Sequence, residues 1–381
     1  MLCKVCRSSD LVDGLAKLRY YVTSDSRSTD FKPVTLRCNT CGLLQKKTDE
    51  EFVRFTSMLY LAYNIFEQSS GNDQKIFGHN GEPANRTSLA ARRVRSLLDK
   101  KRTGKLAEVG CGYGQFLAEF STHNPDWILT GFDLSDKYTS SVTKIKNSKY
   151  ICGDFTNHEG NYDVIAGFHL LEHLYEPESF LHHCVQMVKP DGLITFLVPN
   201  VKTSLFDLVI ADHVCHFAAE HIKILAARVG LEVVEIDEDF ISKELFIVLK
   251  RPKNVNPSIF SRTPCLTSEG KDIDFLLQFE KLVMSIESPF YIFGSSIAAT
   301  WILQIKRELV TAFLDQDVQR IGRWHEGLEI QSADKIQSAT TVVMPFNADV
   351  LALIMKGLPE VGAEFIHPSL LRGPVTQNST Y

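Results

Sequence analysis

Residues 106–114 read Leu-Ala-Glu-Val-Gly-Cys-Gly-Tyr-Gly, an apolar run that ends in three glycines at alternate positions. The apolar run predicts a buried β-strand, and glycines allow the backbone of a turn to approach a ligand closely. Residues 115–120 then predict a helix, whose first N–H groups have no partner inside the helix. This strand–turn–helix pattern predicts a cofactor-binding site in an α/β fold.

The chain after this stretch alternates between strand-like and helical segments. Strands are predicted at 106–109, 127–132, 150–155, 162–168, 193–198, 231–236 and 245–249, and helices at 115–120, 177–188 and 218–229. A short acidic connection joins the last two strands, which predicts a hairpin. Five β-α units and a terminal hairpin predict a doubly wound α/β sheet of seven strands, with helices on both faces and one antiparallel strand.

Carboxylates near the glycine turn narrow the kind of cofactor. Asp133 ends the second predicted strand, where it can accept hydrogen bonds from both hydroxyls of a ribose. Asp154 ends the third strand and can accept from an adenine amino group, while Phe155 can lie beside the base. Dinucleotide motifs have the spacing G-x-G-x-x-G and hold a pyrophosphate. The G-x-G-x-G spacing and the acidic Glu108, which would repel pyrophosphate, instead favour the positively charged sulfonium cofactor S-adenosylmethionine (SAM).

The stretch from Glu108 to Asn200 resembles the class I SAM-dependent methyltransferases, whose seven-stranded sheet has an antiparallel last strand. The resemblance implies that a methyl group is transferred from SAM to an acceptor. It also implies a set of cofactor-binding residues, which are Glu108, Gly110, Gly112, Gly114, Asp133, Asp154 and Phe155.

The first 50 residues contain two C-x-x-C pairs, with 31 residues between them, formed by Cys3, Cys6, Cys38 and Cys41. A tight turn points both sulfurs of a pair the same way, and two pairs complete a tetrahedral shell of four thiolates around zinc. A short segment with few large apolar groups also needs such a link in order to fold. All four coordination positions are filled, so we predict a structural zinc.

Composition shifts divide the chain into six parts. They are a zinc-binding module (1–50), a helical substrate/cofactor cap (51–103), the SAM-binding methyltransferase core (104–252), a linker (253–275), a Rossmann-like α/β domain (276–372) and a tail (373–381). This arrangement resembles the zinc-containing sugar C-methyltransferases, which act on nucleotide-linked deoxysugars in bacteria. The C-terminal runs that carry the resemblance are 291–294, 313–315, 321–327 and 343–347. The resemblance implies a small-molecule acceptor, a sugar or nucleotide-sugar.

The glycine turn of the last domain is reduced to Gly294-Ser295-Ser296, so we infer no second nucleotide cofactor there. We expect this domain to line one side of the substrate cleft or to form a contact between subunits of an oligomer.

A run after the fifth strand provides the candidate base, since loops at the carboxyl ends of parallel strands line the cleft in this fold class. The sugar C-methyltransferases carry Y-H-E-H here; Asp212 and His213 match its E-H, while Ile210 and Ala211 replace the tyrosine and the first histidine. Histidine titrates near neutral pH, so we predict that His213 removes the acceptor proton with help from Asp212.

Two further positions are candidates on the substrate side. His173, after the fourth strand, is the second candidate base, with Asp212 as a carboxylate that could orient it. Tyr60 and Tyr63 precede the core, where the family often places a tyrosine, and the sequence does not choose between them. The missing Y-H pair keeps two alternatives open: a non-catalytic scaffold that binds SAM or its product S-adenosylhomocysteine (SAH), and a methyltransferase for another small-molecule acceptor.

The composition excludes several other classes. The 381 residues include 41 Lys and Arg against 46 Asp and Glu, a net charge of −5, which provides no electrostatic footprint for nucleic acid or an acidic membrane. No apolar run reaches the roughly 18 residues of a membrane span, and the N-terminus lacks the pattern of a signal peptide. Nine cysteines, an odd number, argue against a disulfide framework. We therefore expect a cytoplasmic protein.

Overall fold

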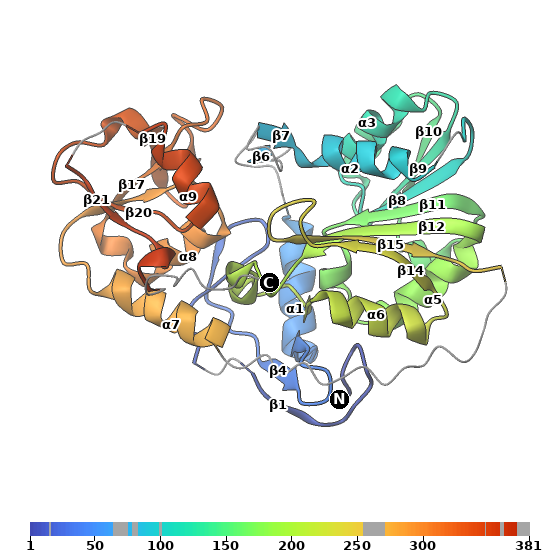
Figure 1. Ribbon diagram of the computed structural model, residues 1–381, viewed down its shortest axis with the longest axis horizontal. Helices are drawn as coiled ribbons and strands as arrows, with labels where there is room; N and C mark the ends of the chain where they lie inside the picture. The colour runs from blue at the N-terminus through green and yellow to red at the C-terminus, as the bar shows by residue number, and fades with distance from the viewer. Residues whose placement is uncertain are drawn as a thin grey trace, which may run out of the picture.

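The computed structural model describes residues 1–14, 17–63, 75–77, 83–98, 101–253, 271–346, 348–358 and 362–371. Figure 1 shows two α/β bodies, with the blue N-terminal segment and its helix α1 (Glu50–Leu61) between them. None of the described helices combines the length and the apolar character that crossing a membrane requires.

The larger body is built on a seven-stranded sheet. Its strands, in spatial order, are β10 (Ser148–Cys152), β9 (Ile128–Asp133), β8 (Lys105–Val109), β11 (Tyr162–Phe168), β12 (Val188–Pro199), β15 (Glu244–Lys250) and β14 (Glu232–Asp237). β15 runs antiparallel to both of its neighbours, and the other adjacent pairs are parallel. The predicted seven-stranded sheet with one antiparallel strand is therefore confirmed.

Helices cover both faces of this sheet, because successive strand residues are apolar and point to opposite sides. In β11, Val164 packs with the cluster under α2 (Arg86–Ser96) and α3 (Gln115–His123), whereas Ile165 packs with the cluster under α5 (Pro177–Met187) and α6 (Ala219–Arg228). Each such buried side chain contributes about 1.5–3 kcal/mol to folding. The short helix α4 (Thr139–Val142) adds Val142 to the α2–α3 side.

The N-terminal segment shares a sheet with the larger body. The four strands are β1 (Leu11–Asp13), β4 (Thr35–Cys38), β5 (Leu44–Lys46) and β13 (Cys215–His216), all antiparallel to their neighbours. β13 lies between β12 and α6 in the chain, so the predicted run 210–213 leads directly into the edge strand of the N-terminal sheet. A separate hairpin pairs β2 (Tyr21–Val22) with β3 (Ser28–Thr29).

The C-terminal body is a second α/β unit. Its sheet has the order β18 (Trp324–His325), β19 (Leu328–Ser332), β17 (Val310–Asp315), β16 (Phe290–Phe293), β20 (Thr341–Val343) and β21 (Glu364–Ile366). All adjacent pairs are parallel except β18 with β19. Its helices are α7 (Lys271–Met284), α8 (Ile297–Ile305) and α9 (Ala348–Met355). The hairpin β18–β19 adds an antiparallel edge strand to this otherwise parallel sheet.

The remaining described elements are short. They are the hairpin β6 (Lys75–Phe77) and β7 (Pro83–Asn85), and the 3-10 turns η2 (Asp136–Tyr138), η3 (Phe155–Asn157), η4 (Leu171–His173), η5 (Leu205–Val209), η6 (Arg307–Leu309), η7 (Ala333–Lys335) and η8 (Pro368–Leu371). Most of the predicted linker 253–275 lies outside the described residues, and α7 already begins at Lys271. The predicted tail 373–381 also lies outside the described residues.

Candidate active site

The glycine loop after β8 has the backbone shape that the sequence predicts. Gly110, Gly112 and Gly114 have φ values of 71°, 49° and 75°, in the left-handed region that favours glycine. A Cβ atom at Gly114 would lie 2.9 Å from Val142 Cγ2, whereas a Cβ at Gly112 would meet nothing within 4 Å. The loop is therefore packed on the α4 side and open at Gly112.

Two predicted cofactor carboxylates lie beside this loop. Asp133 accepts hydrogen bonds from Gly112 N (2.9 Å) and Ser135 N (3.2 Å), and burial raises the pKa of its carboxyl group. Glu108 is buried, and its Oε2 atom has no hydrogen-bond partner among the described residues. Burial, followed by the charge of Asp133, raises the pKa of Glu108 well above its usual value. A buried carboxylate oxygen without a partner fits a ligand that brings donor groups or positive charge.

The third predicted cofactor segment, Asp154 and Phe155 after β10, differs in part from the sequence-based expectation. Asp154 caps η3 through its Oδ1 atom, which accepts from Thr156 N at 2.9 Å. Phe155 is only 3% exposed, and its ring packs against Phe132 with centroids 5.0 Å apart. The strand predicted at 150–155 ends at Cys152, so the Phe155 ring enters the hydrophobic core and does not present an open face.

Leu134 provides an apolar surface that the sequence reasoning missed. It directly follows Asp133, is 72% exposed, and its carbonyl oxygen accepts from Cys152 Sγ at 3.5 Å. An exposed leucine between the ends of β9 and β10 suits contact with a flat purine ring. The available signal was an apolar residue placed directly after a carboxylate at a strand end.

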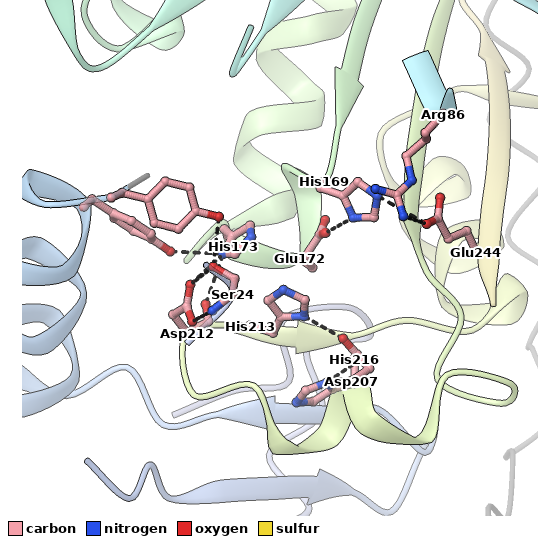
Figure 2. A network of polar contacts seen from close by, with 12 residues as sticks. Ser24, Arg86, His169, Glu172, His173, Asp207, Asp212, His213, His216 and Glu244 are labelled. Atoms are coloured by element: carbon pink, nitrogen blue, oxygen red, sulfur yellow. Dashed lines mark hydrogen bonds and ion pairs between the residues drawn. The ribbon is translucent and has the colours of Figure 1, made fainter. Parts of the chain in front are cut away.

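The second part of the site is a cluster of histidines and carboxylates, shown in Figure 2. Asp207, in η5, accepts hydrogen bonds from the Nδ1 atoms of His213 and His216, both at 2.6 Å. The two imidazoles hold the pKa of Asp207 well below its usual range despite burial. Burial lowers the pKa of His213, but Asp207 outweighs burial and raises it, whereas burial brings the pKa of His216 down to about 4.

His173 lies next to this pair, with its ring centroid 4.7 Å from that of His213. Its Nδ1 atom contacts Tyr60 Oη at 3.0 Å and lies 3.5 Å from Asp212 Oδ2. Burial, together with the charge of His213, lowers the pKa of His173. The oxygens of Asp212 accept from Ser24 N (2.8 Å) and Ser24 Oγ (2.5 Å).

These contacts change one sequence-based role. The carboxylate that orients His213 is Asp207, whereas Asp212 lies against His173 and Ser24. The sequence signal for Asp207 was a lone aspartate within the apolar run 205–209, because a buried carboxylate needs a charged or donor partner. Both candidate tyrosines join the cluster: Tyr60 reaches His173, and Tyr63 Oη lies 3.1 Å from Ser24 Oγ.

A line of charged groups extends from the cluster toward β15, also visible in Figure 2. His169 Nδ1 lies 3.2 Å from Glu172 Oε1, and His169 Nε2 lies 3.5 Å from Glu244 Oε1, which accepts from Arg86 at 2.6 Å. Burial disfavours the charged imidazolium of His169, but the carboxylates outweigh burial and raise its pKa to about 9. Sequence reasoning did not identify this line of contacts.

Lys46 is a second unpredicted feature. It lies in β5, is fully buried, and donates to Thr35 Oγ1 at 2.9 Å. Burial lowers the pKa of Lys46 to about 7, although the charges of Asp207 and Asp212 oppose this. The N-terminal sheet thus brings a buried amine close to the histidine cluster.

The four cysteines of the N-terminal module lie together. Cys3 Sγ is 3.6 Å from Cys41 Sγ, Cys6 Sγ is 3.5 Å from Cys38 Sγ, and all four sulfurs lie within 4.8 Å of one another. Zn–S bonds of about 2.3 Å in a tetrahedron give sulfur–sulfur distances of ~3.8 Å, so the cluster has the size of a four-thiolate zinc site. His221, in α6, contacts the Cys41 carbonyl at 3.0 Å and ties the cluster to the larger body.

Comparison with known proteins agrees with the fold and the glycine loop. The methyltransferase domain family matches residues 84–236, the segment that contains the loop, Asp133 and the histidine cluster. The chain is 31% identical over 120 residues to the ubiquinone biosynthesis O-methyltransferase of Azoarcus sp. (strain BH72), covering 29% of this chain and 51% of that protein. It is 33% identical over 122 residues to the protein of the same name from Salmonella paratyphi A (strain ATCC 9150 / SARB42), covering 29% and 49%.

The matching segment thus spans about half the length of these curated relatives. Among solved structures, the plantazolicin methyltransferase BpumL in complex with SAH is 16% identical, with a TM-score of 0.39 over 54% of this chain and 92% of that chain. The CurJ carbon methyltransferase is 18% identical, with a TM-score of 0.37 over 44% and 54%. Residues 84–236 match a methyltransferase domain, and the sheet built in and around this segment has the seven strands and the antiparallel strand expected from the sequence.

Proposed function

We propose that the protein transfers a methyl group from SAM to an oxygen or carbon of a small polar acceptor, a sugar or nucleotide-sugar. One observation carries the proposal: Glu108, near the end of β8, and Asp133, at the end of β9, lie at the carboxyl ends of parallel strands, and the histidine cluster is built from the segments that follow the parallel strands β11 and β12 in the same sheet. Ligand sites in such sheets form at this edge.

Each cofactor residue would contact a different part of SAM. The Asp133 carboxylate would accept from the ribose hydroxyls, Asp154 would accept from the adenine amino group, and Leu134 would cover the base. Glu108, with its unpartnered Oε2 atom, would face the positively charged amino-acid end. Bound SAM supplies an electrophilic methyl group that needs no further activation. The protein must therefore position the acceptor and remove its proton.

We assign the base role to His213. Its Nδ1 atom is bonded to Asp207, which leaves Nε2 as the atom that accepts the proton when the acceptor oxygen or carbon takes the methyl group. Asp207 would also stabilise the imidazolium that forms, because its negative charge raises the pKa of His213. His173 is the second candidate base, with Tyr60 and Asp212 at its Nδ1 atom.

The acceptor class has a second candidate. The curated relatives are named for O-methylation in ubiquinone biosynthesis, which favours a hydroxyl of a non-sugar small molecule. The four-cysteine module and the second α/β unit favour the sugar acceptor. Together with the core, they form the order of domains by which the sequence resembles the sugar C-methyltransferases. We propose that zinc in the cysteine cluster is structural, since four thiolates leave no open coordination position.

Two measurements test the proposal. Calorimetric titration with SAH should show binding that Asp133→Asn weakens, and a screen of nucleotide-sugars and hydroxylated small molecules should find a product heavier by one CH2 unit. A folded protein that does not bind SAH would contradict the methyltransferase proposal. If the protein binds SAH but methylates no acceptor, and His213→Ala leaves SAH binding unchanged, the result would support the non-catalytic scaffold instead.

A further inference from the structure

The hairpin β2–β3 lies between α8 of the C-terminal body and the histidine cluster. On one side, three α8 side chains donate hydrogen bonds to backbone carbonyls of the hairpin segment. Thr300 Oγ1 donates to Ser26 O at 3.0 Å, Trp301 Nε1 donates to Tyr20 O at 3.1 Å, and Gln304 Nε2 donates to Tyr21 O. These positions form one turn of α8, so a single face of the helix fixes the hairpin.

On the other side, the hairpin holds the loop that carries the cluster. Ala211 N donates to Val22 O at 2.7 Å, and Val22 forms a parallel bridge with Ile210. At the tip of the hairpin, the N–H and hydroxyl of Ser24 both donate to the carboxylate of Asp212. The hairpin is thus hydrogen-bonded to two consecutive residues of the loop that leads into His213.

Asp212 depends on these donors. Its side chain is fully buried, and a buried carboxylate without hydrogen bonds is destabilised by several kcal/mol. Ser24 supplies both of the short contacts, and they place Asp212 Oδ2 3.5 Å from His173 Nδ1. Movement of the hairpin would therefore change the position of Asp212 and the electrostatic environment of His173.

We propose that the C-terminal body is a positioning element for methyl transfer: α8 fixes the hairpin, and Ser24 at its tip fixes Asp212 and the loop of the candidate base. This inference rests on the proposed function for the role of the cluster, but the mechanical link can be measured on its own. Gln304 and Ser24 are positioning residues, because neither needs to contact the cofactor or the acceptor.

The first test is hydrogen–deuterium exchange on the full chain without ligand. Gln304→Met removes the donor to Tyr21 O while keeping a side chain of similar length. We expect exchange in residues 20–26 and in 210–214 to rise about fivefold, the effect of one lost hydrogen bond. Lys306→Met is the matched control, because its Nζ atom donates to the carbonyls of Met284 and Ile286 within the C-terminal body.

Thr300→Val provides a second variant should Gln304→Met not fold. The inference is wrong if residues 210–214 exchange at the wild-type rate in the variant, or if Lys306→Met accelerates them equally. SAH affinity should stay at the wild-type value in Gln304→Met, because the glycine loop is held by contacts with Phe132, Asp133 and Val142, which lie outside the hairpin. A failure of the wild-type protein to bind SAH would instead contradict the proposed function, so the two failures are distinguishable.

The second test uses turnover once an acceptor is found. Ser24→Ala and Gln304→Met should each lower kcat, with the KM for SAM unchanged. Because both act through Asp212, the double variant should lose less than the product of the two single losses. Fully multiplicative losses would show that the residues act independently and would overturn the inference.

Discussion

The glycine loop and the histidine cluster are built in opposite ways. The loop comes from neighbouring elements β8, α3 and β9, and its Glu108 carboxylate keeps an oxygen without a partner among the described residues. The cluster joins side chains from four distant parts of the chain, near residues 24, 60, 173 and 207–216, and their hydrogen bonds are largely internal. The first region is prepared for a ligand, whereas the second depends on the assembly of the whole chain.

Metal removal should produce the largest difference between the two regions, with a loss of turnover and no loss of SAH binding. β5 pairs with β13, which contains His216, so the N-terminal module holds the cluster, while the glycine loop makes no such pairing within the described residues. We expect chelation of the zinc-loaded protein, or Cys38→Ser, to lower turnover more than about 100-fold, the loss that follows a displacement of catalytic groups by ~1 Å. Calorimetry should show SAH affinity close to that of the untreated protein. Zinc added back should restore turnover, and full activity after chelation would contradict the structural role.

Asp207→Asn should affect catalysis without affecting the cofactor. The neutral amide of this variant could not stabilise an imidazolium at His213, so we expect kcat to fall on the order of 10²–10⁴-fold, the usual contribution of general base catalysis. Asp207 raises the pKa of His213 against burial, so the acid limb of the kcat/KM profile should move to lower pH in the variant. Asp191→Asn, which changes a half-buried aspartate paired with Lys250 and Lys253 away from the cluster, is the control. An unmoved acid limb would exclude His213 as the base.

Asp133→Asn should show the opposite pattern. The change keeps the shape of the side chain but removes a charged acceptor for ribose hydroxyls, and hydrogen bonds to charged groups contribute about 1.5–3 kcal/mol each. We expect the Kd for SAH to rise roughly 10–100-fold by calorimetry. The acid limb of the pH profile at saturating SAM should stay where it is in the wild type. A variant with normal SAH affinity would remove Asp133 from the cofactor site.

The same contrast explains what the sequence could predict. The glycine loop, Asp133 and the seven strands follow from contiguous patterns, because strand period, glycine spacing and strand-end carboxylates are local properties. The partner of His213 was missed because Asp207 lies in a 3-10 turn inside an apolar run, and its contacts depend on tertiary folding. Ser24 lies 188 residues from Asp212 in the chain, a pairing that no local pattern indicates.

Phe155 shows the reverse case, because the strand predicted at 150–155 ends at Cys152. A local pattern placed it at a strand end beside the base, but Gly153, with φ of 139°, follows the last residue of β10 and Asp154 caps the next turn. The chain then turns the ring into the core, where it contacts Phe132 and Phe180. The exposed Leu134 was overlooked because an apolar side chain is expected to be buried.

His169 lies between the two regions and gives the test with the smallest expected effect. It follows β11, whose neighbour β8 leads into the glycine loop, and it contacts Glu172, which precedes His173. Its pKa rises from about 6.5 in the unfolded chain to about 9 in the fold, so its ion pairs stabilise the folded state fully below pH 6.5 and lose this effect as the pH rises through 9. One pKa unit corresponds to about 1.4 kcal/mol, so a rise of about 2.5 units contributes at most ~3.5 kcal/mol. The free energy of unfolding in urea should therefore differ between wild type and His169→Gln at pH 6, and the difference should shrink toward pH 9.5. A difference independent of pH would mean that His169 acts by packing alone.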